Sequence, residues 1–300
     1  MEFQPLPEDY RSGFVAIMGS PNVGKSTLMN ALVGEKVAIV TEKAQTTRNK
    51  VVGVLTREHY QIVFLDTPGL HTPKNKLGEY MVKTAYDAGR DVDLTMMVID
   101  GRIGIRQRDQ GIVEKLRSER FLAVINKIDA IPEERVEELR RQLQELAVQK
   151  SQILTISARE GTGLAELEET ICRYLLPGPQ FYPPDMVTDR PERFIAGELI
   201  REKALLNLRD EVPHGLGVEI EKIEAEAALT KVSAVIYCER QSHKGMVIGK
   251  GGAMLKKIGS QARADLEMLF GTKVFLQLWV KVKEDWRNSG FMLKELGYRD

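Results

Sequence analysis

Short apolar runs alternate with helix-like stretches along the first half of the chain. The runs are rich in Val, Ile and Leu without strict polar alternation, which is typical of strands covered on both faces. They predict six strands, at Phe14–Gly19, Val51–Thr56, Gln61–Asp66, Leu94–Asp100, Phe121–Asn126 and Gln152–Ser157. Strands that alternate with helices in this way favour an α/β domain with a mostly parallel sheet.

Prolines and glycines interrupt this pattern after Leu176. They crowd into ten residues, at Pro177, Gly178, Pro179, Pro183 and Pro184. Neither a helix nor a central strand tolerates that density. We therefore expect a first domain over residues 1–176, a proline-rich linker over residues 177–190 and a second domain over residues 191–300.

The second domain has a different order of elements. Its pattern predicts a helix, two strands, two helical segments and a strand, at Pro191–Arg209, Gly217–Ala227, Lys231–Glu239, Ala253–Ile258, Gln261–Phe270 and Lys273–Val282. An amphipathic segment follows at Asp285–Leu296. The order α-β-β-α-α-β predicts a small α+β domain.

Composition and charge exclude several classes of protein. The 300 residues include 43 Lys and Arg and 43 Asp and Glu, so the formal net charge is zero and a globally basic nucleic-acid coat is excluded. Two cysteines are too few for a disulfide framework and favour a cytoplasmic location. The longest apolar runs have five residues, against roughly 20 for a membrane-spanning helix. The acidic start of the chain argues against a signal peptide.

Residues 19–26, with the sequence GSPNVGKS, fit the phosphate-loop pattern G-x-x-x-x-G-K-[ST]. The loop follows an apolar strand and opens a helix, where backbone N–H groups and the helix dipole favour phosphate. Lys25 is placed to bridge the β- and γ-phosphates, and the Ser26 hydroxyl to ligate Mg²⁺. The predicted nucleotide contacts of this loop are Gly19, Ser20, Pro21, Asn22, Val23, Gly24, Lys25, Ser26 and Thr27.

Three later segments, each at the carboxyl end of a predicted strand, favour GTP over ATP. Asp66 is placed to reach the Mg²⁺ shell, and the Gly69 N–H to meet the γ-phosphate. Asp129 accepts hydrogen bonds only, which suits the two adjacent donors of guanine and leaves an ATP-bound site with an unpaired charge. Asn126 is expected to brace the base loop, and the Ala158 N–H to donate to guanine O6. The predicted contacts are Asp66, Thr67, Pro68, Gly69, Leu70, Asn126, Lys127, Ile128, Asp129, Ser157, Ala158 and Arg159.

The polar stretch Glu35–Lys50 suits a switch segment that Mg²⁺ and the γ-phosphate would order, and a second switch is expected over Gly69–Lys76. Thr47 is the predicted metal-ligating hydroxyl, with Thr46 as the alternative. The predicted metal ligands are Ser26, Thr47 and Asp66, and the predicted catalytic residues are Lys25, Thr47, Asp66 and Gly69.

Leu70 stands where many regulatory GTPases place a glutamine that orients the attacking water. A leucine side chain cannot form that hydrogen bond. We therefore expect slow intrinsic hydrolysis, which relies on Mg²⁺, Lys25 and backbone donors to stabilise charge.

A G-x-x-G loop, Gly249–Gly252, lies in the second domain, between the predicted strand Lys231–Glu239 and the next predicted helix. In K-homology domains such a loop clamps the backbone of about four single-stranded nucleotides. The stretch Arg240–Lys283 has nine basic and two acidic residues, which supports a nucleic-acid surface. The predicted RNA contacts are Val247, Ile248, Gly249, Lys250, Gly251, Gly252, Lys256 and Lys257. Five late aromatic residues could stack on bases, but most of them are expected to pack in the core or between helices. They are Phe275, Trp279, Trp286, Phe291 and Tyr298.

The order of GSPNVGKS, TTR, DTPG, NKID and SA, followed by the proline-rich stretch and VIGKGG, resembles the Era family of bacterial GTPases over essentially the whole chain. The resemblance implies a P-loop GTPase domain with a six-stranded sheet followed by a type II K-homology domain. It also implies GTP or GDP with Mg²⁺ as ligands, and a GTP-bound form that binds the 3′ end of 16S rRNA while the small (30S) ribosomal subunit is assembled.

The same resemblance implies a mainly cytoplasmic protein with partial association with the inner face of the cell membrane, and we expect a monomer. Related GTPases with an asparagine where Asn22 stands use a potassium ion in hydrolysis, so K⁺ is a further hypothesis.

Two other functions compete with this interpretation. A membrane-linked signalling GTPase would couple growth or the cell cycle to its GTP state and would present its basic face to anionic lipid, but lipid needs no phosphate clamp. A tRNA-modification GTPase would need no K-homology domain, and the end of this chain lacks a catalytic cysteine motif. We rank that function last.

Overall fold

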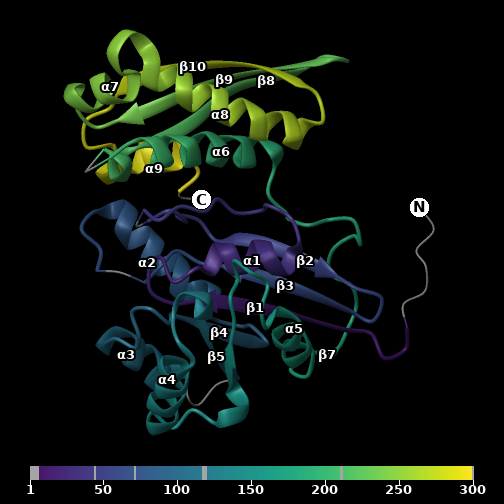
Figure 1. Cartoon of the computed structure of the whole chain (residues 1–300). Coiled ribbons are helices and arrows are strands. Elements are labelled where there is room, and N and C mark those ends of the chain that lie inside the picture. The colour runs from purple at the N-terminus through teal and green to yellow at the C-terminus, as the bar shows by residue number, and fades with distance from the viewer. Residues whose placement is uncertain (1–6, 44, 71, 117–119, 210–211, 299–300) are drawn as a thin grey trace. The chain divides into compact units, whose positions relative to one another are not determined.

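The computed structural model describes residues 7–43, 45–70, 72–116, 120–209 and 212–298. The chain forms two compact units (Figure 1). Unit 1 comprises Met1–Ala38, Thr47–His71 and Met81–Asp189, and unit 2 comprises Ile39–Thr46, Thr72–Tyr80 and Arg190–Asp300.

The centre of unit 1 is a sheet with the strand order β2-β3-β1-β4-β5-β6, and β7 pairs with β1. The strands are β1 Arg11–Met18, β2 Val51–Thr56, β3 Tyr60–Asp66, β4 Leu94–Asp100, β5 Phe121–Asn126, β6 Ile153–Thr155 and β7 Leu176–Pro177. Only the β2–β3 and β1–β7 pairs are antiparallel. The six predicted strands are all present, and the α/β class with a mostly parallel sheet is confirmed.

Helices cover both faces of this sheet, which explains why its strands are almost continuously apolar. On one face, α1 (Lys25–Val33) and α5 (Leu164–Cys172) bury Leu28, Met29 and Leu167 against the strands. On the other face, α3 (Gln107–Leu116) and α4 (Glu133–Glu145) bury Val113 and Leu139, as the layers in Figure 1 show. The loops at the carboxyl ends of the strands are thereby fixed to a rigid core.

The proline-rich stretch is attached to unit 1 along residues 178–187, which we call the strap. The Gln61 side chain donates to the Tyr182 carbonyl at 2.9 Å and accepts from the Phe181 and Tyr182 N–H groups at 2.8 and 3.0 Å. Val54 N–H donates to the Val187 carbonyl at 2.8 Å. Because Gln61 is fully buried, these bonds satisfy an amide that would otherwise be costly to bury.

Unit 2 packs helices on one face of a three-stranded sheet with the order β10-β9-β8. Its elements are α6 Glu192–Asn207, β8 Gly217–Ala225, β9 Leu229–Cys238, α7 Gln241–Ile248, α8 Ala253–Phe270, β10 Lys273–Val282 and α9 Gly290–Glu295. β9 and β10 are parallel, and β8 and β9 are antiparallel. In Figure 1 α6 and α8 lie together on this one face.

The predicted order α-β-β-α-α-β is confirmed, but the predicted bounds of its two inner helices were wrong. The helical segments predicted at Ala253–Ile258 and Gln261–Phe270 are one continuous helix, α8, and a further helix, α7, precedes the G-x-x-G loop. Gly259 and Ser260 suggest a break in sequence, but tertiary packing overrides the propensity of about 1 kcal/mol against glycine in a helix. The G-x-x-G loop therefore joins two helices rather than a strand and a helix.

Parts of both predicted switch segments belong to unit 2. Within that unit the Val40 N–H donates to the Glu202 carboxylate of α6 at 2.9 Å, and Arg201 donates to the Thr46 carbonyl. The Lys76 N–H donates to the Asn288 side chain at 3.1 Å. The backbone of these segments is thus held by side chains distant in sequence.

Candidate functional site

The phosphate loop connects β1 to α1 at the carboxyl edge of the sheet. Gly19 has φ +146° and Gly24 has φ +99°, so both occupy backbone conformations that side chains disfavour. A Cβ at Gly19 would lie 2.4 Å from the Val98 carbonyl oxygen, and one at Gly24 would lie 2.4 Å from the Asn126 amide nitrogen. Gly24 also caps α1, which leaves the first N–H groups of that helix directed at the loop.

Lys25 is almost completely buried inside this loop. Its ammonium group donates to the carbonyls of Gly19 and Ser20 at 3.2 and 3.1 Å. Burial lowers the pKa of Lys25 to about 8, against the attraction of Asp66. A buried cation whose hydrogen bonds go to carbonyl groups is well placed to gain from an anionic phosphate.

Ser26, Asp66 and Thr47 meet beside Lys25. The Ser26 hydroxyl donates to Asp66 Oδ2 at 2.6 Å and lies 2.9 Å from the Thr47 hydroxyl, which donates to the same oxygen at 3.4 Å. Asp66 is fully buried, and its Oδ1 has no hydrogen-bond partner. Burial raises the pKa of Asp66 above its usual range.

Two hydroxyls and an unpartnered buried carboxylate oxygen are the hard oxygen ligands that Mg²⁺ prefers. Ser26, Thr47 and Asp66 therefore fit the metal that the phosphate loop implies. The Thr46 hydroxyl is engaged elsewhere: it donates to the Lys43 carbonyl at 2.7 Å and lies 2.6 Å from the Thr41 hydroxyl. Of the two threonines, only Thr47 lies with the other two predicted ligands.

The predicted base-recognition residues gather at the ends of β5 and β6. Asn126 is buried and donates to the Val23 carbonyl at 2.9 Å, so it braces the phosphate loop. Its carbonyl oxygen accepts from the Lys127 and Ala158 N–H groups at 2.8 and 3.0 Å. Asp129 is exposed and accepts from the Ser157 hydroxyl at 2.6 Å. The Ala158 N–H, expected to donate to guanine, is thus already bonded to Asn126.

Two aspartates that were not predicted from the sequence hold other residues of this site in place. Asp100, at the end of β4, pairs with Lys127 at 2.6 Å, and the same ammonium donates to the Asn22 carbonyl at 2.6 Å. Asp109, on α3, accepts from the Ser20 hydroxyl at 2.8 Å. Neither belongs to a motif, although an aspartate that ends an apolar strand at the ligand-binding edge was a usable signal.

Leu70 lies in the core rather than in the site. Its side chain packs in the cluster around Ile112 and Val113, while its N–H donates to the Gly19 carbonyl at 3.3 Å and its carbonyl accepts from Arg108 at 2.9 Å. Its neighbour Gly69 lies against the phosphate loop, because a Cβ there would lie 2.8 Å from Pro21 Cα.

The G-x-x-G loop joins α7 and α8 in unit 2. Gly249, Gly251 and Gly252 all have positive φ, and a Cβ at Gly251 or Gly252 would meet no atom within 4 Å. The backbone is therefore open to a ligand at these two positions. Lys250, Lys256 and Lys257 are exposed and Ile248 is half-buried around it.

Val247, predicted as an RNA contact, is fully buried in the core of unit 2. Its side chain anchors α7 and is unavailable to a ligand.

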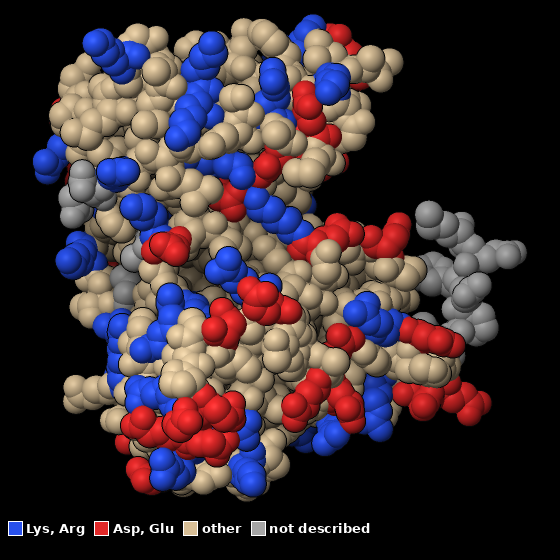
Figure 2. Space-filling model, in the orientation of Figure 1, with Lys and Arg blue, Asp and Glu red and all other residues tan. Residues whose placement is uncertain are grey.

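The basic character expected for this region is visible in Figure 2, where blue side chains outnumber red ones over the α8 face of unit 2. The red cluster in the lower part of the same view lies over α4, which has a glutamate-rich outer face.

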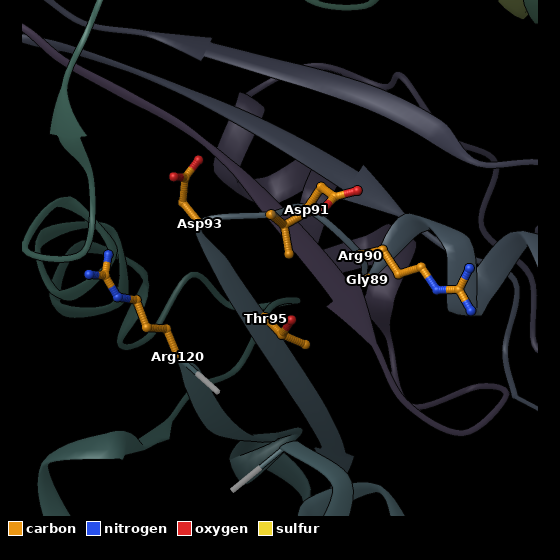
Figure 3. A pocket seen from close by; sticks show the side chains of 7 residues that line it. Gly89, Arg90, Asp91, Asp93, Thr95 and Arg120 are labelled. Carbon is orange, nitrogen blue, oxygen red and sulfur yellow. The ribbon is translucent and has the colours of Figure 1, made fainter. Parts of the chain in front are cut away.

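A polar pocket of about 380 Å³ lies at the amino ends of β4 and β5, the opposite edge from the phosphate loop. It is lined by Gly89, Arg90, Asp91, Val92, Asp93, Thr95 and Arg120. The Arg90 and Arg120 side chains extend in opposite directions (Figure 3), so they do not converge on one anion. Asp93 is engaged with the Phe14 N–H at 2.7 Å. The phosphate loop remains the better candidate site for a nucleotide.

Comparison with known proteins supports both parts of this site. A family model described as 50S ribosome-binding GTPase matches residues 14–127, and one described as KH domain matches residues 211–287. GTPase Era of Clostridioides difficile is 51% identical over 296 residues, which are 97% of this chain and 99% of that protein. GTPase Era of Alkaliphilus metalliredigens is 49% identical over 293 residues, 96% and 99% of the two chains.

Two solved structures resemble the whole chain. One is Era in complex with MgGDPNP and nucleotides 1506–1542 of 16S ribosomal RNA, with a TM-score of 0.92 and 41% identity over 96% of this chain and 99% of that one. The other is a point variant of Aquifex aeolicus Era bound to GDP and aluminium fluoride, with a TM-score of 0.90, 41% identity and the same coverage.

Proposed function

The chain belongs to the Era family of GTPases, and from that premise we propose that it is a GTP-dependent switch that acts on the small ribosomal subunit. It binds GTP and hydrolyses it slowly to GDP and phosphate. In the GTP-bound form it binds the 3′ end of 16S rRNA and assists the assembly of the 30S subunit. One observation carries the proposal: a single chain combines a buried Lys25–Asp66 phosphate site with an open G-x-x-G loop.

The nucleotide half of the proposal follows from the arrangement of charge. Lys25 neutralises charge on the β- and γ-phosphates, and Asp129 pairs with the two adjacent donors of guanine. Ser26, Thr47 and Asp66 hold Mg²⁺, which supplies positive charge against the phosphates when bound. The backbone of Gly69 lies against Pro21 of the phosphate loop, and we assign its N–H to the γ-phosphate.

Hydrolysis is slow because no side chain at position 70 orients a water molecule. Leu70 is buried in the core, and its aliphatic side chain has no group that could hydrogen-bond to the water even if the loop rearranged. The structural relative with GDP and aluminium fluoride, a stand-in for the transferred phosphoryl group, supports turnover on this fold.

The RNA half follows from unit 2. Gly251 and Gly252 leave the backbone open to phosphates, and the exposed Lys250, Lys256 and Lys257 supply positive charge around the loop. The Era relative holds 16S rRNA nucleotides 1506–1542. The proposed RNA for this chain is therefore the corresponding end of the small-subunit rRNA.

The proposed location is the cytoplasm, with peripheral association with the inner face of the cell membrane, and the proposed state is a monomer. Across the described residues no helix is both long and apolar enough to cross a bilayer.

The test measures binding of labelled 16S rRNA 3′-end RNA to the full chain loaded with a non-hydrolysable GTP analogue or with GDP. The variant Lys250→Asp/Gly251→Asp should abolish analogue-favoured binding. Lys294→Asp/Gly297→Asp is the matched control, because it makes the same charge change in the same unit, and Gly297 also has positive φ and open space.

The RNA function would be contradicted if binding were weak and its affinity were the same with either nucleotide and in both variants. Binding to anionic vesicles, measured in parallel, would then favour the membrane-linked alternative. GTP hydrolysis is measured separately, and its absence would contradict the nucleotide half.

A further inference from the structure

The edge strand β10 presents an unusual outward face. Its alternate residues face away from the core and all are exposed, whereas the residues between them pack toward the α6 and α8 side. The outward residues are Lys273, Phe275, Gln277, Trp279 and Lys281. These five residues comprise two cationic side chains, two aromatic side chains and one amide, and none of them is acidic. We call them the β10 face.

The aromatic rings of the β10 face are largely exposed. Phe275 is 51% exposed and Trp279 44% exposed, whereas the other tryptophan, Trp286, is fully buried. Four residues along a strand separate the two rings by about 13 Å. Large aromatic groups on a strand are normally buried, so two on the same open face mark a binding surface.

We propose that the β10 face is a second contact surface for single-stranded RNA, on which Phe275 and Trp279 each stack on a base. This inference rests on the proposed RNA function and extends it beyond the G-x-x-G loop. Aromatic rings flanked by cations are the usual platform for single-stranded nucleic acid, because every base has a π-face and every phosphate a charge. The central Gln277 amide can donate to and accept from base edges.

The β10 face is a candidate surface for RNA that extends beyond the G-x-x-G loop. Helix α7, which leads into that loop, packs against β10. The loop clamps only about four nucleotides, yet the RNA held by the Era relative spans nucleotides 1506–1542. Further nucleotides therefore need a surface beyond the loop, and the β10 face offers one in the same unit, on the side of β10 opposite α7.

The ion pairs of the β10 face do not oppose this role. Lys273 pairs with Glu267 at 3.4 Å and Lys281 with Glu221 at 3.1 Å. All four side chains are partly or largely exposed, and exposed pairs contribute little stability. Phosphate groups can replace these carboxylates. In register beside Phe275, Lys231 of β9 adds a third cation, which pairs with the exposed Glu226 at 2.6 Å.

The experiment compares two RNAs from the 3′ end of 16S rRNA, one of about four nucleotides that fills only the clamp and one of about 12 that extends beyond it. Both are titrated against the full chain with the GTP analogue. The exposed double variant Phe275→Ala/Trp279→Ala should lose affinity for the longer RNA by about 100-fold, since each stack contributes about tenfold. Its affinity for the shorter RNA should not change.

Two controls make the result specific. Phe291→Ala removes a ring that is 71% exposed on α9 and should bind both RNAs like the wild type. Trp279→Phe keeps a stacking ring and should retain most of the affinity. The longer RNA should quench the tryptophan emission of the wild type and leave that of Trp279→Phe unchanged, because the remaining Trp286 is buried.

Three results would overturn the inference: unchanged affinity of the double variant for the longer RNA, an equal loss for both lengths, or quenching by anionic phospholipid vesicles but not by RNA. Each can arise while the shorter RNA still binds through Lys250 and Gly251, so the second surface can fail without the proposed function. If the wild type binds neither RNA, both the second contact surface and the proposed RNA function are wrong.

Discussion

The carboxylate of Asp129 accepts a 2.6 Å hydrogen bond from the Ser157 hydroxyl, which lies 28 residues further along the chain. This bond joins the loops after β5 and β6 and leaves Asp129 exposed at the sheet edge. A carboxylate held in this way is oriented for two adjacent donors on a base.

We predict that Asp129→Asn lowers GTP affinity by about 10²–10⁴-fold, because two charge-assisted hydrogen bonds to guanine are weakened. The same variant should bind XTP better than the wild type does, since xanthine has an acceptor where guanine has its amine. Titration with fluorescent GTP and XTP measures both affinities. Ser157→Ala should have a smaller effect on GTP, and equal GTP binding by wild type and Asp129→Asn would disprove the role of the carboxylate.

Thr46 and Thr47 provide a matched pair for the metal site. Thr47→Ala should weaken Mg²⁺-dependent binding of the GTP analogue by about tenfold or more, because a hydroxyl beside Ser26 and Asp66 is lost. Thr46→Ala should leave that binding nearly unchanged, since its hydroxyl bonds to Thr41 and Lys43. Analogue binding is measured with and without Mg²⁺; the reverse order of effects would assign the ligand to Thr46.

A role for potassium in GTP hydrolysis is a hypothesis that can be tested at Asn22 of the phosphate loop. Asn22 has φ +65°, and its carbonyl is held by Lys127 at 2.6 Å, so its backbone is fixed in a rarely populated conformation. We predict faster GTP hydrolysis in KCl than in NaCl at matched ionic strength, and loss of that difference in Asn22→Ala. Equal wild-type rates in the two salts would remove the hypothesis.

Asp100 should make the folded state sensitive to acid. Burial tends to raise the pKa of Asp100, but hydrogen bonds from Arg102 and Lys127 outweigh it and hold the pKa below the usual value. The resulting stability is present above the unfolded-state pKa of about 3.9 and is lost as pH falls through the lower folded-state pKa.

Asp100→Asn should therefore lower the free energy of unfolding by about 1–3 kcal/mol at neutral pH and by much less in strong acid. Urea unfolding of the nucleotide-free protein at both pH values measures this difference. Asp87→Asn is the control, because its pair with Arg90 at 3.4 Å is exposed and contributes little. A pH-independent effect of Asp100→Asn would contradict the linkage.

The strands and motif residues of unit 1 were predictable because their signals are local. Buried parallel strands are continuous apolar runs, so Val51–Thr56, Leu94–Asp100 and Phe121–Asn126 coincide with β2, β4 and β5. Ligands of α/β sheets gather where such strands end, and this placed Asp66 and Asp129 on the same edge.

The remaining features depend on contacts distant in sequence, which no local pattern records. Asp100 and Asp109 position the site through Lys127 and Ser20, far away in the chain. The expected burial of the late aromatic residues holds for Trp286 and Tyr298 but fails for Phe275, Trp279 and Phe291. Hydrophobicity alone cannot distinguish a core ring from one on an open face.

The strap also determines where a fragment that contains unit 1 alone should end. β2 is the outer strand of its sheet, and its apolar residues are hydrogen-bonded to the strap through Val54 and Val187. A fragment that ends at Leu176 would expose this edge and the buried Gln61, and exposed apolar edges template aggregation. A fragment that continues to Asp189 keeps the edge covered and should stay monodisperse where the shorter one precipitates.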